Sequence, residues 1–103
     1  MTLKQLEYTT SHVSSQAYQT GRIVVVHVAG YLDKSVAVWD TLTIGSGLPH
    51  SIKWMGTPAM NQDVNDPRAV VSVNESGVLQ IESKGAAIPG GWVFANLVYI
   101  TYM

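Results

Sequence analysis

The chain has 103 residues, of which 47% are hydrophobic and only 13% charged, with a formal net charge of −1 and no cysteine. The length fits one domain, and the lack of cysteine excludes disulfides, thiolate chemistry and cysteine-based metal sites. The lack of a basic run gives no reason to expect nucleic-acid binding. No apolar run exceeds about seven residues, so a membrane span is not predicted. No basic segment followed by an apolar one is visible, so a signal peptide is not predicted either.

The shortage of charge is informative, because an average globular domain carries about 25% charged residues. One interpretation is that part of the surface is buried in an interface between copies. The alternative is that polar uncharged side chains replace charges, as in many small all-β proteins. We favour the interface.

The amino-terminal third is predicted to contain one clear strand. Residues 1–20 read as a polar entering segment, with a short strand at 6–9, and residues 21–103 as a single head domain. A strand is predicted at 22–29, between Gly21 and Gly30. Both of its faces are largely apolar, with Val24, Val26 and Val28 on one and Ile23, Val25, His27 and Ala29 on the other.

The middle of the chain alternates strands and breaks. Strands are predicted at 35–44 and 51–55, followed by a loop over 56–67, and loops of that length are usually functional or mobile. Strands at 69–73 and 78–83 are joined by the short turn sequence Asn74-Glu75-Ser76-Gly77, which predicts a hairpin.

The last strand is predicted within residues 92–103, and again both faces are apolar. A half-exposed strand normally shows one polar face. Because so short a chain can hardly cover its terminal strand on both sides, we expect an oligomer. Several short strands with regular turn signals predict an all-β fold, an antiparallel β-sandwich or knob-like barrel.

No catalytic motif is present, and we expect neither an enzyme nor a cofactor. The spacing of His12, His27 and His50 does not match a zinc site, and His27 is more simply a packed or interface residue. Residues 63–66 offer oxygen ligands but lack the Gly and distal Glu of an EF-hand loop. A glycosidase carboxylate pair would need a deeper cleft than this chain can enclose.

The aromatic residues favour a sugar-binding site. Sugars lay apolar C–H faces on indole rings, and their hydroxyls pair with planar polar side chains. The residues flanking the long loop supply that combination: His50, Trp54, Asp63 and Arg68. For Trp54 both sugar binding and structural packing stay open, whereas packing is favoured for Trp39 and Trp92.

The order of these segments resembles a known family. The valine strand at 21–30, Leu-Thr-Ile…Gly-Leu-Pro at 42–49, Val-Ser-Val-Asn-Glu-Ser-Gly-Val-Leu-Gln-Ile at 71–81 and the last strand Ala-Asn-Leu-Val-Tyr-Ile-Thr-Tyr are similar to the carboxy-terminal head domains of phage tail-fibre and receptor-binding proteins from phages of Gram-positive bacteria. The resemblance covers residues 21–103.

The resemblance implies a homotrimeric β-sandwich head at the virion tail tip. It also implies a shallow site for host cell-wall saccharide, with His50, Trp54, Asp63 and Arg68 at the matching positions. Two alternatives stay open, namely a bacterial carbohydrate-binding module or small lectin, and a purely structural virion component.

Overall fold

The computed structural model describes residues 3–61, 69–85 and 87–102. These residues form nine strands and no helix, so none of the described segments is a helix that could cross a membrane. The strands are β1 (Lys4–Gln5), β2 (Thr9–Thr10), β3 (Ser15–Thr20), β4 (Ile23–Leu32), β5 (Thr41–Ser46), β6 (Met55–Asn61), β7 (Ala69–Val73), β8 (Leu79–Ser83) and β9 (Gly91–Ile100).

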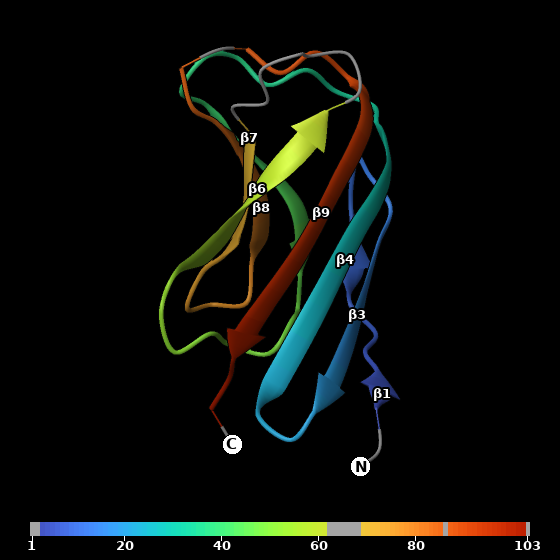
Figure 1. The fold of residues 1–103 in the computed structure, drawn as a ribbon, viewed down its shortest axis with the longest axis vertical. Coiled ribbons are helices and arrows are strands. Elements are labelled where there is room, and N and C mark those ends of the chain that lie inside the picture. Colours follow the sequence, from blue (N-terminus) through green and yellow to red (C-terminus); the bar gives the residue numbers. More distant parts are fainter. Residues whose placement is uncertain (1–2, 62–68, 86, 103) are drawn as a thin grey trace.

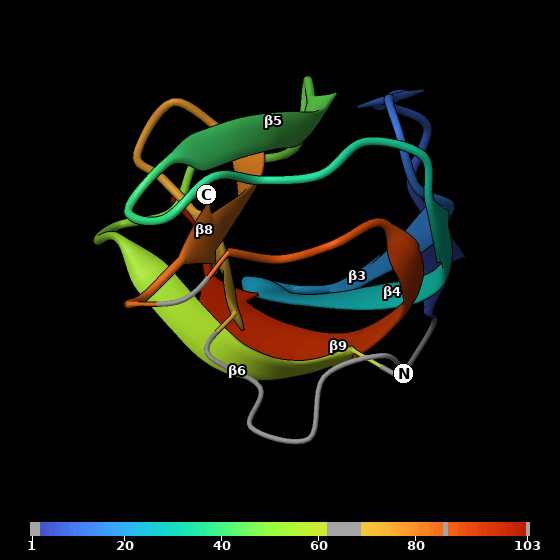
Figure 2. The same cartoon turned by 90° about the horizontal axis from the view of Figure 1, so that it is seen from above.

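All strand pairs are antiparallel and belong to one curled sheet with the order β1-β3-β4-β9-β6-β7-β8-β5-β2. The sheet curls at β6. The first part of this strand, from Met55 to Ala59, pairs with β7, and only its last two residues, Met60 and Asn61, pair with β9. Seen from above, β5 lies across the barrel from β9 (Figure 2). The all-β antiparallel, barrel-like fold predicted from the sequence is confirmed.

The amino-terminal segment connects the two edges of this sheet. β1 pairs with β3 at one edge and β2 pairs with β5 at the other, and only residues 6–8 separate them. The backbone N–H of Leu6 still bonds the carbonyl of Ala17, and that of Ser11 bonds the carbonyl of Ile44. Both edges are therefore very short strands, which limits the unpaired backbone available for aggregation.

The core consists of the inward residues of the long strands. β4 and β9 pair over ten positions, side by side at the front of Figure 1, and turn Val24, Val26, Leu97 and Tyr99 inward. β7 and β8 complete the core from the opposite side with their own apolar residues, among them Val71, Val73, Leu79 and Ile81.

The β7–β8 turn is fixed by its own sequence. The Asn74 side-chain oxygen accepts bonds from the backbone N–H groups of Ser76 and Val78, which is the local bonding that makes Asn a turn residue. Gly77 has a φ of 75°, and an ideal Cβ there would lie 2.1 Å from the Leu48 carbonyl oxygen. Only glycine fits at this position, and the hairpin predicted at 69–83 is confirmed.

Three predicted elements are wrong. The strand at 35–44 begins only at Thr41, because Trp39 has a left-handed φ of 62° inside a turn closed by Asp40 and Ala37. Of the strand predicted at 51–55, Ser51 makes a single bridge and its hydroxyl bonds the Lys53 carbonyl, while Met55 already begins β6. The described part of the loop predicted at 56–67 is the strand β6.

The entering segment also differs from its prediction. The strand expected at 6–9 is replaced by β1 and β2, and β3 was missed. β3 escapes recognition because Ala17 is its one fully buried apolar residue. β6 was not predicted as a strand because it contains Pro58. The proline is tolerated because β6 is paired only with β7 at that position.

Tyr99 links the end of β9 to the core. Its ring is buried, and its hydroxyl donates to the Pro49 carbonyl at 2.8 Å. Burial raises the pKa of the phenol well above its ordinary value near 10, and Tyr8 close by raises it further. Burial also raises the pKa of Tyr8, while its hydrogen bond to Ser15 lowers it.

We expect the protein to lose stability in alkaline solution because of Tyr99. Because the pKa of Tyr99 is higher in the folded than in the unfolded protein, its contribution to the free energy of unfolding is complete below the unfolded pKa of about 10. This contribution is lost as the pH rises from there toward the folded pKa. Urea unfolding between about pH 8 and pH 11.5 would measure the decline. Tyr99→Phe should be less stable at pH 8 by about 1 kcal/mol and decline less steeply; equal slopes would show that other groups cause the loss.

Candidate functional site

Trp54 lies on the outer surface of the sheet, just before β6. The benzo ring occupies the place where a side chain of Gly56 would stand, since an ideal Cβ on Gly56 would be 2.6 Å from Cη2 of Trp54 and 3.0 Å from Cγ1 of Val70. Because Gly56 has no side chain, the indole can pack directly against the backbone of the strand, beside Val70. Trp54 remains 50% exposed, so the ring can serve as an apolar platform.

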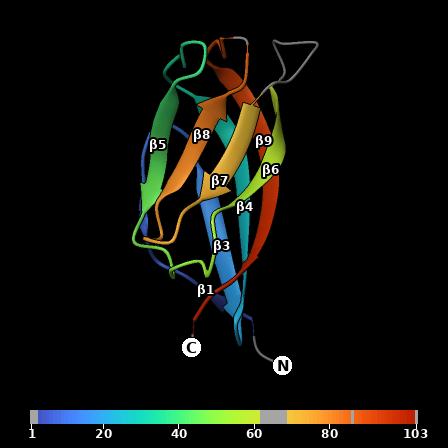
Figure 3. The same cartoon turned by 90° about the vertical axis from the view of Figure 1, so that its left-hand side faces the viewer.

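The polar neighbour of this platform is Glu82. In the sheet register, Gly56 is opposite Ser72, and Val70 is opposite Glu82. Cross-strand partners have Cβ atoms about 5 Å apart. The side chain of Glu82 on β8 therefore begins about that far from Val70 on β7, the residue beside the indole. Figure 3 shows β5, β8, β7 and β6 following one another around this side.

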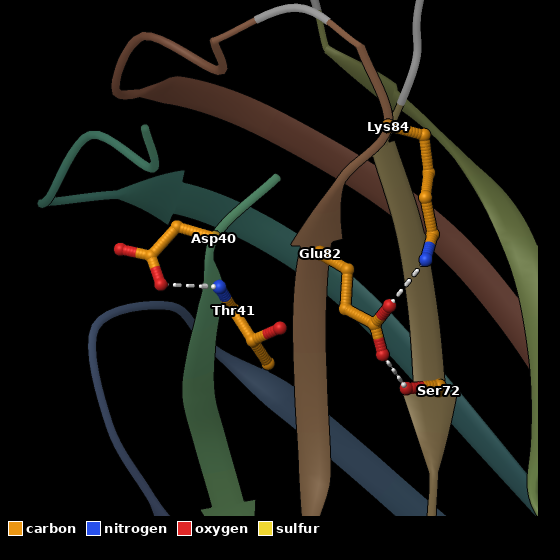
Figure 4. Close-up of polar contacts among 5 residues, drawn as sticks. All are labelled: Asp40, Thr41, Ser72, Glu82 and Lys84. Atoms are coloured by element: carbon orange, nitrogen blue, oxygen red, sulfur yellow. Dashed lines mark hydrogen bonds and ion pairs between the residues drawn. The ribbon is translucent and has the colours of Figure 1, made fainter. Parts of the chain in front are cut away.

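The Glu82 carboxylate is held in one orientation. One oxygen accepts a hydrogen bond from the Ser72 hydroxyl at 3.3 Å, and the other lies 2.7 Å from Nζ of Lys84 (Figure 4). The Glu82 side chain is only 15% exposed. Each carboxylate oxygen has a further lone pair, so the group can still accept hydrogen bonds from a ligand.

Asp40 and Thr41 extend this polar surface onto β5. Thr41 is paired with Glu82, and its backbone N–H bonds the Asp40 carboxylate at 2.9 Å. Asp40 also accepts the backbone N–H of Ser83 through its carbonyl, at 3.0 Å. Several polar groups of β5, β7 and β8 are thus fixed next to one another (Figure 4). We call Trp54, Gly56, Val70, Ser72 and Glu82 the Trp54 surface.

Of the four residues predicted for the site, the two that the structure describes, His50 and Trp54, have different neighbours. His50 is exposed, and its ring lies beside the β7–β8 turn, 3.3 Å from an ideal Cβ on Gly77. Trp54 instead covers Gly56. Asp63 and Arg68 lie outside the described residues. Glu82 was not predicted for the saccharide site, because only the pairing of β6, β7 and β8 relates it to Trp54.

The other two tryptophans are also exposed in the single chain. Trp39 is 71% exposed in the turn before β5. Trp92 lies on the outside of β9, where Tyr31 of β4 contacts it edge to face with ring centroids 6.1 Å apart. Neither ring is a residue of the core.

Trp92 belongs to an apolar outer surface of β4, β9 and the ends of β6, which we call the β4–β9 face. Its large exposed side chains are Ile23, Tyr31, Met55, Met60, Trp92, Phe94, Val98 and Ile100. At the end of this face formed by the start of β4 and the end of β9 there is a groove of about 330 Å³. It is lined by Ile23, Ile52, Lys53, Met55, Val98, Tyr99 and Ile100. In the middle, Nδ1 of His27 bonds the Asn96 side-chain oxygen at 2.6 Å.

The predicted apolarity of both faces of β4 and β9 takes a specific form here. The inward faces are covered by the rest of the chain, and the outward faces are open. Exposed apolar patches of this extent mark interaction surfaces in soluble proteins.

Comparison with known proteins adds no assignment. The chain matches no protein-family model, and a search among curated proteins gives no relative. Within the described ranges, no group of three or more His, Cys, Asp or Glu side chains is arranged to hold a metal ion.

Proposed function

We propose that this protein is an adhesive head domain, of the kind at the tip of phage tail fibres, which binds host cell-surface saccharide as a homotrimer. The observation that carries the proposal is the half-exposed indole of Trp54, which lies on Gly56 of β6, two strands from the fixed carboxylate of Glu82 on β8. The proposal places the protein on the virion.

The Trp54 surface suits a saccharide for two chemical reasons. A pyranose ring has an apolar C–H face, which can lie on the exposed side of the indole. Its hydroxyl hydrogens need acceptors held at a set position, and the Glu82 carboxylate is held by Ser72 and Lys84. Such an open site should bind one sugar weakly, with a Kd on the order of millimolar.

The β4–β9 face supports the trimer. Weak single sites become useful when several copies are held together, because the second contact is then intramolecular. The interface would have to leave Trp54 uncovered, because Trp54 directly precedes Met55 of this face, whereas Glu82 lies further round the sheet on β8. A trimer in solution would also distinguish the phage head from a monomeric carbohydrate-binding module.

Replacing Trp54 tests the saccharide site. We expect Trp54→Ala to abolish binding to purified bacterial cell-wall saccharide, measured by pull-down and by calorimetry. Because the ring is half exposed, the variant should still melt cooperatively within about 5 °C of the wild type.

Trp39→Ala is the matched control, since it removes an equally large exposed indole from the turn before β5. It should leave binding unchanged. If Trp54→Ala unfolds the protein or breaks the oligomer, Trp54 is a structural anchor. If it folds and binds like the wild type, the Trp54 surface is not the saccharide site.

A further inference from the structure

A polar groove runs along the outside of β3 and β4, away from the Trp54 surface. It consists of two adjoining hollows of about 410 and 250 Å³ that share Thr10 and Ser14. Together they fall within the size range of small-molecule sites. The larger hollow is also lined by Ser15, Gln16, His27 and Ala29, and the smaller by Ser11, His12, Val13 and Tyr31.

The wall of the groove is fixed to β4 by its backbone. The Asp33 N–H bonds the His12 carbonyl at 2.9 Å, and the Ala29 N–H bonds the Ser14 carbonyl at 3.2 Å. Gly30 permits the close approach, because an ideal Cβ there would lie 3.1 Å from both Cβ and the backbone nitrogen of Ser14. The groove is therefore held in shape before any ligand arrives, which lowers the entropic cost of binding.

Both imidazoles in the groove are oriented by a neighbour. Nδ1 of His12 lies 2.8 Å from the Asp33 carboxylate, and Nδ1 of His27 lies 2.6 Å from the Asn96 side-chain oxygen. Since both partner oxygens can only accept, each Nδ1 must donate. In the neutral ring this leaves Nε2 as a hydrogen-bond acceptor in each histidine.

Donors complement these acceptors. The Gln16 side-chain oxygen already accepts the Tyr18 hydroxyl at 3.2 Å, so the Gln16 amide group presents its N–H donors. Thr10 and Ser14 add hydroxyls, which both donate and accept. Tyr31, 60% exposed and steadied by its contact with Trp92, adds an aromatic surface at one end.

We propose that this groove is a second saccharide site, which binds one or two rings of a neutral glycan. Alternating donors and acceptors match adjacent sugar hydroxyls, each of which both donates and accepts, and Tyr31 matches a C–H face. Among the described residues that line the groove there is no Asp, Glu, Lys or Arg, and Asp33 beside it is paired with His12, which favours a neutral ligand over an anionic one. The inference rests on the proposed function for its ligand class but not on Trp54.

Amide-shift NMR on the whole protein tests the groove. Titration with glucose, galactose or N-acetylglucosamine should shift the amides of Gln16, His27 and Ala29 with a millimolar Kd. The same shifts should persist in Trp54→Ala. Two groove variants should weaken them at least tenfold, namely Gln16→Ala and His12→Asn; Asn keeps the left-handed backbone that His12 adopts at a φ of 67°.

Gln5→Ala is the matched control, because Gln5 is an exposed glutamine on β1 outside the groove. It should leave every shift unchanged. Sugar-dependent shifts around Trp54 with none in the groove would overturn this inference and leave the proposed function standing. Shifts in neither place would overturn both. Groove shifts that vanish in Trp54→Ala would overturn the claim of a second site.

Discussion

Deletion of residues 98–103 is expected to abolish folding. β9 is an interior strand, paired with β4 over its full length and with β6 at one end. The deletion removes the partners of Ile23, Val24 and Val25, so this end of β4 becomes an open edge. It also removes Thr101, whose hydroxyl bonds the His50 carbonyl at 2.6 Å and whose backbone bridges Ser51.

The loss of Tyr99 alone is enough to make the truncated chain marginal. Removing a buried aromatic side chain of this size costs about 3–5 kcal/mol, while a whole domain is stable by only about 5–15 kcal/mol. The hydrogen bonds of the lost strand add to that cost. Circular dichroism and calorimetry of the truncated protein should show no cooperative melting transition.

A shorter truncation provides the control. Deletion of residues 102–103 removes the exposed Tyr102 and keeps the Tyr99 and Thr101 contacts, so this variant should fold and melt close to the wild type. A soluble, cooperatively melting protein without residues 98–103 would show that the end of β9 is peripheral to the fold.

The strands that the sequence predicted are those whose inward residues are strongly apolar. Alternating valines in β4 indicate both the strand and its inward face, whereas the largely apolar residues of β9 indicate a strand but not which face is inward. β3 lacks such a signal, and β6 contains Gly56 and Pro58, which read as loop residues in isolation. Their place in a strand depends on pairing with β7, a contact between residues distant in the sequence.

The candidate site was predictable only in part, for a related reason. The exposed indole of Trp54 could be anticipated from the residue type. Its packing on Gly56 could be predicted only if β6 had been recognised as a strand. Glu82 becomes a neighbour only through the register that sets Val70 opposite it. The groove at His12 and His27 is formed by residues from β3, β4 and the turn before β3. No local spacing of residues in the sequence predicts that these segments come together.

The β4–β9 face is expected to be the trimer interface, so that Val98→Asp converts the protein to monomers. Seven large side chains on this face, leaving out Tyr31 at the border with the polar groove, are roughly half exposed. At roughly 100 Å² each they come to about 700 Å² per subunit, close to the size of a standard stable interface. Val98 lines the groove at one end of the face and is 54% exposed. An aspartate there would bury one unpaired charge per subunit on assembly, at a cost of several kcal/mol each.

Sedimentation at about 100 µM, a generous concentration for an obligate interface, should give the wild type a mass of about 34 kDa, three times the 11.2 kDa of the chain. Val98→Asp should sediment as a folded 11.2 kDa monomer, since in the single chain its side chain faces solvent. Thr43→Asp places the same charge on the exposed side of β5, across the barrel, and should remain trimeric. A monomeric wild type would refute the trimer, and a trimeric Val98→Asp would place the interface elsewhere.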